Sequence, residues 1–244
     1  MHVEHDLVPV LKKLRLSGIL QTLDLRVRQA VDDDLHPLEY LYRILHDEVE
    51  RREAKQLRLR MSRARFESTK AVEDFDFTFN ADIPMARVID LCTCSFVERR
   101  ENVCLIGPAG VGKSHLAQAI GQRACRAGYK VLYVTATRML TQLRAARADG
   151  SHERTMLRFT SPDLLIVDDL GLRPLRGQEP EDLFDVVKGR YERGSTLFTS
   201  NRSIEEWYPL FGDALLASAA MDRLLHHAHV VRMEGHSYRN PPRA

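Results

Sequence analysis

The residues with the clearest chemical meaning form one glycine-rich stretch, GPAGVGKS, at residues 107–114. It fits the pattern of two glycines with four residues between them, followed by a lysine and a hydroxyl residue: Gly107, Gly112, Lys113 and Ser114. Glycines let the backbone turn its N–H groups inward, and these groups form an anion cradle with the N-terminus of the next helix. The lysine supplies a compact positive charge for the β- and γ-phosphates, and the serine hydroxyl can bind Mg²⁺. The stretch therefore predicts a site for ATP with Mg²⁺. The predicted contacts with the nucleotide are Gly107, Pro108, Ala109, Gly110, Val111, Gly112, Lys113, Ser114 and His115.

Two adjacent carboxylates, Asp168 and Asp169, stand at the end of an apolar run in LLIVDDL, residues 164–170. The apolar residues predict a buried strand, and ligands of open parallel sheets bind outside the carboxyl ends of such strands. On its own the pair would also be compatible with an ordinary solvated turn. With a phosphate loop upstream, the position indicates that Asp168 holds Mg²⁺, directly or through water. Asp169 is then expected to orient or polarise the attacking water.

A third apolar run, STLFTSN at residues 195–201, ends on polar side chains. If its strand lies beside the strand of Asp168, Asn201 can hold the hydrolytic water near the γ-phosphate. Asn201 would alternatively cap the segment SIEEW that follows it, but Ser203 with Glu206 fits a capping box better. Asn201 is therefore predicted to be a catalytic residue.

The elements that must position these residues alternate between strand and helix patterns from Asn102 onward. The apolar runs VCLI, KVLYVTA, DLLIVDD and STLFTSN predict strands, and the stretches KSHLAQAIGQRACRAG and TRMLTQLRAARADG predict helices. Gly128 is expected to close the first of these helices. Strands that alternate with helices predict an α/β fold with a parallel sheet that is flanked by helices on both faces.

The chain before this region is predicted to form a small all-helical domain, residues 1–70. Leucines and isoleucines at mostly three- and four-residue steps indicate helices, with a break at Ser17–Gly18 and a second helix that begins near Pro37. Residues 71–97 are predicted to be an extended connector followed by a helix over DLCTCSFVERRE. Residues 98–244 are predicted to be the ATPase domain.

Positive charge is concentrated in one part of the second helix, although the net charge of the whole chain is only +2. Seven basic residues lie between Arg51 and Arg65, against the single acid Glu53. Such a segment is either a solvated helix face or a nucleic-acid surface, and the near absence of interleaved acids favours nucleic acid. The predicted DNA contacts are Arg51, Arg52, Lys55, Arg58, Arg138, Arg144, Arg147 and Arg154.

The overall composition, with 44% hydrophobic and 29% charged residues, is typical of a globular protein in water. No apolar run approaches the length of a membrane span. Charges interrupt the apolar patches of the N-terminus, MHVEHDLVPVLKKLRL, unlike those of a signal peptide. Cys104 and Cys125 are expected to be buried free thiols, and Cys92-Thr-Cys94 suggests a metal or redox pair but lacks the second half of a zinc site. We therefore expect a cytoplasmic protein that does not contact membranes.

Several stretches together resemble one family, the IstB-like ATP-binding proteins; they are GPAGVGKSHLAQAIG, LLIVDDLG, FTSNR and RLLHHAHVVRMEGHSYR. Members of this family are transposition helper ATPases of bacterial insertion sequences, belong to the AAA+ class of P-loop NTPases, and are related to DnaC and DnaA. The resemblance implies that Arg223, in MDRLLHHAH, is an arginine finger that reaches the γ-phosphate bound by a neighbouring subunit. It also implies that Arg239, in GHSYR, contacts the phosphates in its own subunit.

Two positions depart from the pattern of this family. Related proteins often carry glutamate where this chain has Asp169, and the shorter side chain draws the carboxylate back by a methylene. Slow hydrolysis or a longer water bridge is the expected consequence. Ser114 stands where threonine is common, but the hydroxyl is kept and little should change.

The resemblance also implies the partners of the chain. Because one arginine is donated across an interface, a homo-oligomer is expected to form in the presence of ATP. This oligomer is expected to bind duplex DNA, mostly through phosphates, and to recruit and stimulate a transposase. A helicase loader that grips single-stranded DNA and an ATP-switched adaptor without DNA binding are the alternatives. The stretch from Arg51 to Arg65 holds no aromatic residue on which bases could stack, which favours duplex DNA.

Overall fold

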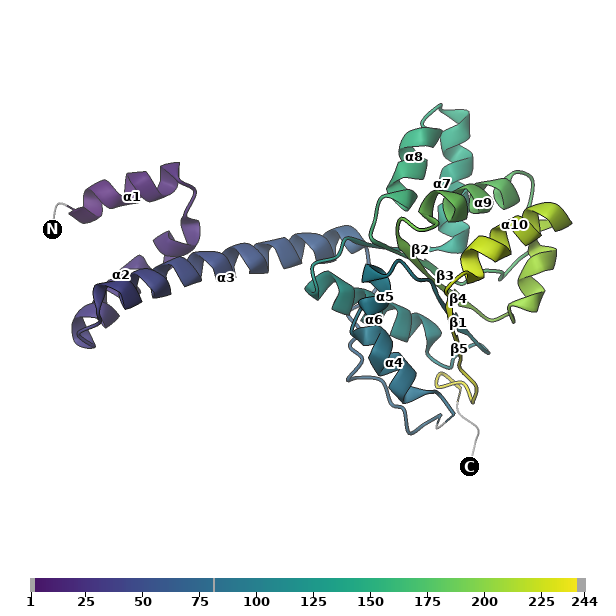
Figure 1. Cartoon of the computed structure of the whole chain (residues 1–244), viewed down its shortest axis with the longest axis horizontal. Coiled ribbons are helices and arrows are strands. Elements are labelled where there is room, and N and C mark those ends of the chain that lie inside the picture. Colours follow the sequence, from purple (N-terminus) through teal and green to yellow (C-terminus); the bar gives the residue numbers. More distant parts are fainter. Residues whose placement is uncertain (1–2, 81, 241–244) are drawn as a thin grey trace. The chain divides into compact units, whose positions relative to one another are not determined.

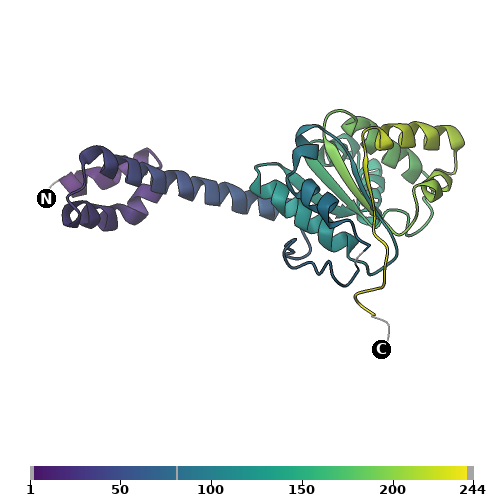
Figure 2. The ribbon, with the colours of Figure 1, turned by 60° about the horizontal axis from the view of Figure 1, so that its bottom comes forward.

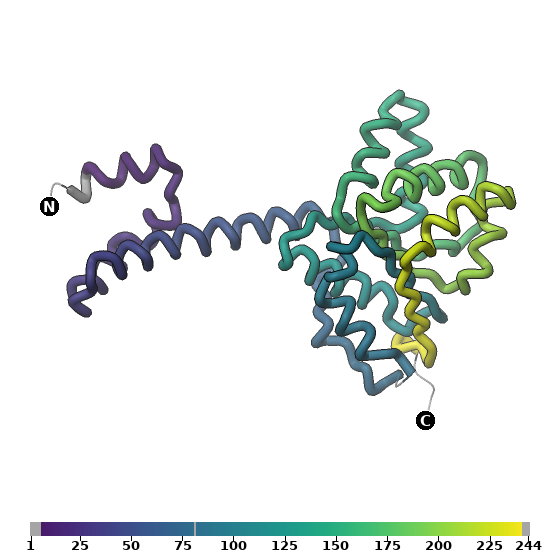
Figure 3. The backbone as a smooth tube through the Cα atoms, in the orientation of Figure 1, coloured from purple at the N-terminus to yellow at the C-terminus, as the bar shows by residue number. Residues whose placement is uncertain are grey.

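The computed structural model describes residues 3–80 and 82–240, and these fall into two compact units, Met1–Leu59 and Arg60–Ala244. The tube in Figure 3 follows the course of the backbone through both units. The sequence places the end of the helical domain at residue 70, whereas the first compact unit ends inside a long helix. No helix within the described residues has both the length and the apolar character that a membrane span requires.

The first unit consists of α1 (Val3–Lys13), α2 (Ser17–Asp32) and most of α3 (Pro37–Ala64). Its small core contains Leu11, Ile19, Leu23 and Ile44. The backbones of α2 and α3 approach closely at Gly18, where a Cβ atom would lie 2.7 Å from the Cα of Glu48. The Glu48 carboxylate accepts the backbone N–H of Gly18. A glycine at this position therefore allows the two helices to pack without a gap.

The second unit is built on a five-stranded parallel sheet. Figure 2 shows this sheet with helices packed against it. The strands are β1 (Val103–Ile106), β2 (Val131–Thr135), β3 (Leu164–Asp168), β4 (Ser195–Ser200) and β5 (His229–Arg232). Their order across the sheet is β2-β3-β4-β1-β5. Strands β1, β3 and β4 are central and buried, which accounts for the nearly continuous apolar sequences of β1 and β3.

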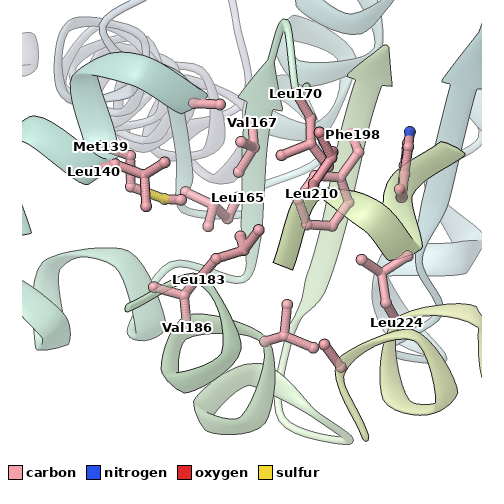
Figure 4. Close-up of a cluster of buried hydrophobic side chains, with 14 of the residues drawn as sticks. Met139, Leu140, Leu165, Val167, Leu170, Leu183, Val186, Phe198, Leu210 and Leu224 are labelled. Carbon is pink, nitrogen blue, oxygen red and sulfur yellow. The ribbon is translucent and has the colours of Figure 1, made fainter. Parts of the chain in front are cut away.

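Helices cover both faces of this sheet (Figure 1). On one face lie α4 (Met85–Cys92) and α6 (Lys113–Arg126), with the short α5 (Ser95–Glu98) near them. The other face is covered by α7 (Ala136–Ala148), α9 (Glu179–Arg190), η1 (Glu205–Phe211) and α10 (Ala214–Leu225), and α8 (His152–Thr160) packs on α7 and α9. Leu165, Val167 and Phe198 point from the sheet into the main core on that second face (Figure 4). The predicted α/β fold is confirmed.

One predicted helix differs from the structure. The sequence DLCTCSFVERRE predicts a single helix, but the chain leaves α4 after Cys92 and restarts in α5 at Ser95. Between them, Cys94 adopts a left-handed conformation with φ 62°, which a continuous α-helix cannot contain. Phe96 and Val97 of α5 are buried by this reversal, so burial of apolar side chains outweighs local helix continuity.

Candidate nucleotide site

The phosphate loop, residues 107–112, joins the end of β1 to the start of α6 and has the backbone of an anion cradle. Gly107, Gly110 and Gly112 have φ values of 151°, 85° and 98°, a region that residues with a side chain rarely adopt. A Cβ at Gly112 would also overlap the ring of Phe75. Because α6 begins directly after Gly112, the free N–H groups of its first turn face the loop.

Lys113, the first residue of α6, is folded back over this loop. Its Nζ donates hydrogen bonds to the carbonyls of Gly107 at 2.8 Å and Pro108 at 2.7 Å. Burial lowers the pKa of this ammonium, while the nearby Asp169 and Asp168 oppose the effect. The two carbonyls thus keep the Lys113 ammonium at the cradle, where its N–H groups can donate hydrogen bonds to a phosphate group instead.

Asp168, the last residue of β3, lies beside Ser114. The Ser114 hydroxyl donates to Oδ1 of Asp168 at 2.9 Å. The hydroxyl of Tyr133 donates to Oδ2 at 2.6 Å, and Thr199 donates to Oδ1. Burial and the hydrogen bond to Asp168 raise the pKa of Tyr133. A hydroxyl and a carboxylate at this separation, beside a phosphate cradle, are hard oxygen donors that fit Mg²⁺.

Asp169 follows β3 in a left-handed conformation, with φ 58°. Its backbone N–H donates to the Thr199 hydroxyl at 2.9 Å. Burial, and then the neighbouring charge of Asp168, raise the pKa of the Asp169 carboxyl. A carboxylate with raised basicity at the mouth of the cleft can accept a proton from a water molecule or orient that water.

A cleft of about 780 Å³ joins these residues to Asn201 and Arg239. Asn201 follows β4, next to β3, and Arg239 comes from the C-terminal segment beyond β5. Gly107 and Pro108 are not among the residues that line the cleft, and their carbonyls serve Lys113 instead. The predicted residues that line the cleft together are Ala109, Gly110, Val111, Gly112, Lys113, Ser114, His115, Asp168, Asp169, Asn201 and Arg239.

Two segments distant in sequence form the remaining wall of the cleft: the connector, which no motif in the sequence places there, and the C-terminal segment that carries Arg239. The connector contributes Phe79, whose ring packs on Tyr238 with the centroids 5.0 Å apart. The side chain of Asn80 donates to the carbonyl of His236 at 3.0 Å and accepts its N–H at 2.9 Å. The backbone N–H of Tyr238 donates to the carbonyl of Gly110 in the phosphate loop at 3.0 Å. The connector and the C-terminal segment are therefore joined to each other and to the loop.

His115 shows how the connector is held. Its Nε2 atom lies 3.0 Å from the carbonyl of Ala71, and its ring makes an edge contact with Phe75. Its side chain thus contacts the connector while it also lines the cleft. Gln118, one turn further along α6, accepts the backbone N–H groups of Glu67 and Ser68. The same helix therefore supplies the phosphate cradle and binds the connector together with the residues just before it.

Arg223 lies near the opposite ends of the strands from these residues. It lines a second cleft, of about 370 Å³, together with Arg99, Arg100, His226 and His227. Its guanidinium donates to the carbonyl of Ala219 at 2.6 Å and stands over the ring of Phe184. This cleft includes residues at the beginnings of β1 and β4. The candidate nucleotide-binding residues lie instead at the carboxyl ends of the strands. Arg223 does not line the nucleotide cleft of its own chain.

The predicted DNA contacts fall into two groups. Arg51 and Arg52 form ion pairs with Glu48, and Arg147 pairs with the buried Asp182 at 2.5 Å. Because the Arg147 guanidinium is already bound by the Asp182 carboxylate, Arg147 is a poor candidate for a phosphate contact. Of the predicted DNA contacts, Lys55, Arg58, Arg138, Arg144 and Arg154 are exposed and take part in no ion pair within residues 3–80 and 82–240.

Comparison with known proteins agrees with this geometry. The family model described as IstB-like ATP binding protein matches residues 9–244. An insertion-sequence ATP-binding protein of Mycobacterium tuberculosis is 40% identical over 94% of this chain and 92% of its own length. The ATP-binding protein of insertion sequence IS21 from Pseudomonas aeruginosa is 36% identical over 96% of this chain and 89% of its own.

Solved structures with the same fold include replication proteins. AMPPCP-bound DnaA from Aquifex aeolicus superposes with a TM-score of 0.58 at 21% identity, over 70% of this chain and 51% of that one. The DnaC helicase loader superposes with a TM-score of 0.54 at 17% identity, over 70% of this chain and 97% of that one. The second unit therefore has the AAA+ P-loop fold. The fold, the phosphate loop and the relatives that match along nearly the whole sequence agree, and the chain belongs to the family of IstB-like ATP-binding proteins.

Proposed function

We propose that the chain is an ATP-dependent transposition helper, which assembles as an oligomer on duplex DNA and hydrolyses ATP between its subunits. One observation carries the proposal. The phosphate cradle, the two carboxylates and Asn201 share one cleft, whereas Arg223 projects into another cleft across the sheet. A cationic side chain there can complete the site of a second copy of the chain, in the manner of an arginine finger.

Within one subunit, each residue of the cleft has a distinct task. The cradle and Lys113 bind the phosphates, and Ser114 with Asp168 would hold Mg²⁺. When bound, Mg²⁺ neutralises charge on the β- and γ-phosphate oxygens. Asp169 orients or deprotonates the attacking water, and Asn201 holds that water from the neighbouring strand.

Two arginines are expected to stabilise the negative charge of the transition state. Arg239 lines the same cleft as Lys113 and would contact the phosphates of its own subunit. Arg223 would reach the γ-phosphate of the next subunit, so that hydrolysis requires assembly. The interface is then heterologous, and repeated copies form a ring or an open helix.

DNA binding is proposed to run mainly through phosphates. The exposed bases Lys55 and Arg58 on α3 and Arg138, Arg144 and Arg154 on α7 and α8 are the contacts we favour. Contacts of this kind carry little base specificity and weaken steeply with salt. Repetition along an oligomer can offset the elastic cost of bent DNA.

Recruitment and stimulation of a transposase, with choice of the target site, completes the proposed function. It is supported by the relatives, which are named as ATP-binding proteins of insertion sequences. Hydrolysis would release or remodel the assembly once the transposase has engaged.

A second candidate is a loader that acts on single-stranded DNA, since the AAA+ unit has the same fold as the DnaC helicase loader. Single-strand binding usually relies on aromatic side chains on which bases stack. The basic part of α3 lacks them, and this difference favours duplex DNA.

Electron microscopy of the purified chain, with duplex or single-stranded DNA and with AMPPCP or no nucleotide, tests the proposal. We expect oligomers on duplex DNA only when the nucleotide is present. Assembly on single strands alone would favour the loader. Nucleotide binding without any DNA complex would instead indicate an adaptor.

A further inference from the structure

The Asp168 carboxylate is held by more hydrogen-bond donors than the phosphate loop provides. Ser114 donates to Oδ1 from α6, whereas Thr199 donates to Oδ1 from β4 and Tyr133 donates to Oδ2 from β2. Strands β2 and β4 lie on either side of β3, which carries Asp168. The carboxylate is therefore bound from both neighbouring strands as well as from the loop.

The donors fix the plane of the carboxylate relative to the loop. The terminal torsion of an aspartate is broad, so an unrestrained carboxylate can rotate its plane away from the loop. Here the hydroxyl of Tyr133 holds Oδ2 at 2.6 Å on the side of β2. Oδ1 is left next to the Ser114 hydroxyl, the other oxygen donor proposed for Mg²⁺.

Tyr133 and Thr199 are themselves firmly placed. The Tyr133 side chain is buried in the sheet, and its ring packs near Phe66, with centroids 6.4 Å apart. The Thr199 hydroxyl is fully buried and accepts the backbone N–H of Asp169 at 2.9 Å. A hydroxyl has one proton and two lone pairs, so Thr199 can accept from Asp169 and still donate to Asp168. One threonine thus fixes both carboxylate residues relative to each other.

We propose that Tyr133 and Thr199 are positioning residues for Mg²⁺, which hold Asp168 with Oδ1 presented to the metal beside Ser114. The inference rests on the function proposed above, because it requires that ATP is bound together with Mg²⁺. Hydrogen-bond partners of metal-ligating carboxylates typically change metal affinity about 10- to 100-fold when they are removed. Both residues lie outside the phosphate loop and the aspartate pair, and neither needs to touch the nucleotide.

The test measures how nucleotide binding by the full chain depends on Mg²⁺, with a fluorescent ATP analogue titrated at several Mg²⁺ concentrations. Tyr133→Phe removes one hydroxyl and keeps the ring, Thr199→Val removes the other, and Thr199→Ser keeps it. We expect the half-saturating Mg²⁺ concentration to rise about tenfold or more in Tyr133→Phe and Thr199→Val. Thr199→Ser should stay within about twofold of the unaltered chain, as should the nucleotide affinity of every variant in EDTA.

Tyr208→Phe, which removes an exposed tyrosine hydroxyl on η1, is the matched control and should leave the Mg²⁺ dependence unchanged. The inference is overturned if Tyr133→Phe keeps the Mg²⁺ dependence of the unaltered chain, even if its melting temperature is lower. The Tyr133 hydroxyl would then only provide a hydrogen bond to a buried carboxylate. If Thr199→Val does not fold, Tyr133→Phe alone decides.

Failure of the proposed function has a different signature. The unaltered chain would then bind the analogue equally well with and without Mg²⁺, and Asp168→Asn would change nothing. That result would overturn the metal site and the inference together. If nucleotide binding needs Mg²⁺, and the half-saturating Mg²⁺ concentration rises in Asp168→Asn but not in Tyr133→Phe, the inference alone is overturned.

Discussion

At the scale of single residues, the cleft depends most on the Lys113 ammonium, which already lies against the loop carbonyls. Lys113→Ala should lower ATP affinity about 100-fold, because hydrogen bonds from a charged donor contribute about 1.5–3 kcal/mol each. Titration with a fluorescent ATP analogue measures the decrease. Lys130→Ala removes an exposed lysine just before β2 and should bind as the unaltered chain does. Equal affinities for the two variants would contradict the role of Lys113.

Most of the candidate site could be predicted residue by residue, because its chemistry lies in short contiguous motifs. Lys113, Asp168 and Asn201 each follow a strand-like run, and parallel strands bring their carboxyl ends to one edge. Tyr133 could not be predicted in this way. Within KVLYVTA it has the pattern of any core residue, and only the register of β2 against β3 reveals the contact of its hydroxyl with Asp168. Thr199 lies within the motif FTSN, but the sequence does not show which of its polar residues faces the carboxylate.

At the scale of elements, the turn into α6 depends on Gly112. Gly112 and Gly128 both have left-handed backbones, with φ 98° and 103°, but only at Gly112 would a Cβ overlap a neighbour, the Phe75 ring. Gly128→Ala should therefore cost only the backbone strain, about 1–2 kcal/mol. Gly112→Ala should lower the melting temperature more than Gly128→Ala does, and it should also weaken ATP binding. Equal melting temperatures and equal ATP affinities in the two variants would show that the connector does not support the loop.

The pairing of α2 with α3 is expected to respond to acid. The Arg26 guanidinium holds the pKa of Asp47 down, from 3.8 to about 2. An acid whose pKa is lowered by folding adds stability above its unfolded pKa and loses it as the pH falls through the folded value. Amides of α2 should therefore lose protection from hydrogen exchange between pH 3.8 and about 2.

Asp47→Asn serves as the control for this acid response. The variant should be less protected than the unaltered chain at neutral pH, and its protection should vary less over the acid range. A protection profile with the same pH dependence in both chains would exclude Asp47 as the cause.

The sequence predicts elements well where periodicity and function coincide. The strands that carry the loop, Asp168 and Asn201 were all expected, whereas β5 was not, because HVVR is short and only partly buried. The split between α4 and α5 also escaped prediction. The break results from the burial of Phe96 in the tertiary structure, and no local sequence pattern predicts the left-handed conformation of Cys94.

At the scale of the whole molecule, DNA binding should be governed by salt. Arg58→Gln removes an exposed base of α3 that has no ion pair among the described residues, and should lower the slope of log affinity against log salt by about one for each phosphate that is no longer neutralised. Fluorescence anisotropy with duplexes of different sequence should show the same decrease for each. Arg43→Gln, on the same helix but paired with Glu39, should leave the slope unchanged. If both variants behaved alike, α3 would not carry the DNA contact.

ATP hydrolysis at a site shared by two copies of the chain is the central claim, and a mixing experiment tests it most directly. Arg223→Ala should retain its ATP affinity within about threefold and lose hydrolysis by on the order of 10³, as arginine fingers do. Lys113→Ala, whose ATP affinity should be about 100-fold lower, should be nearly inactive at an ATP concentration close to the Kd of the unaltered chain. In an equal mixture of the two variants, about one quarter of random heterologous interfaces combine an intact loop with an intact arginine.

The ATPase rate of that mixture is therefore the decisive measurement. The shared site predicts that activity reappears on mixing, although each variant alone is inactive. A mixture as inactive as its components, or an Arg223→Ala chain that hydrolyses ATP at the normal rate, would contradict it.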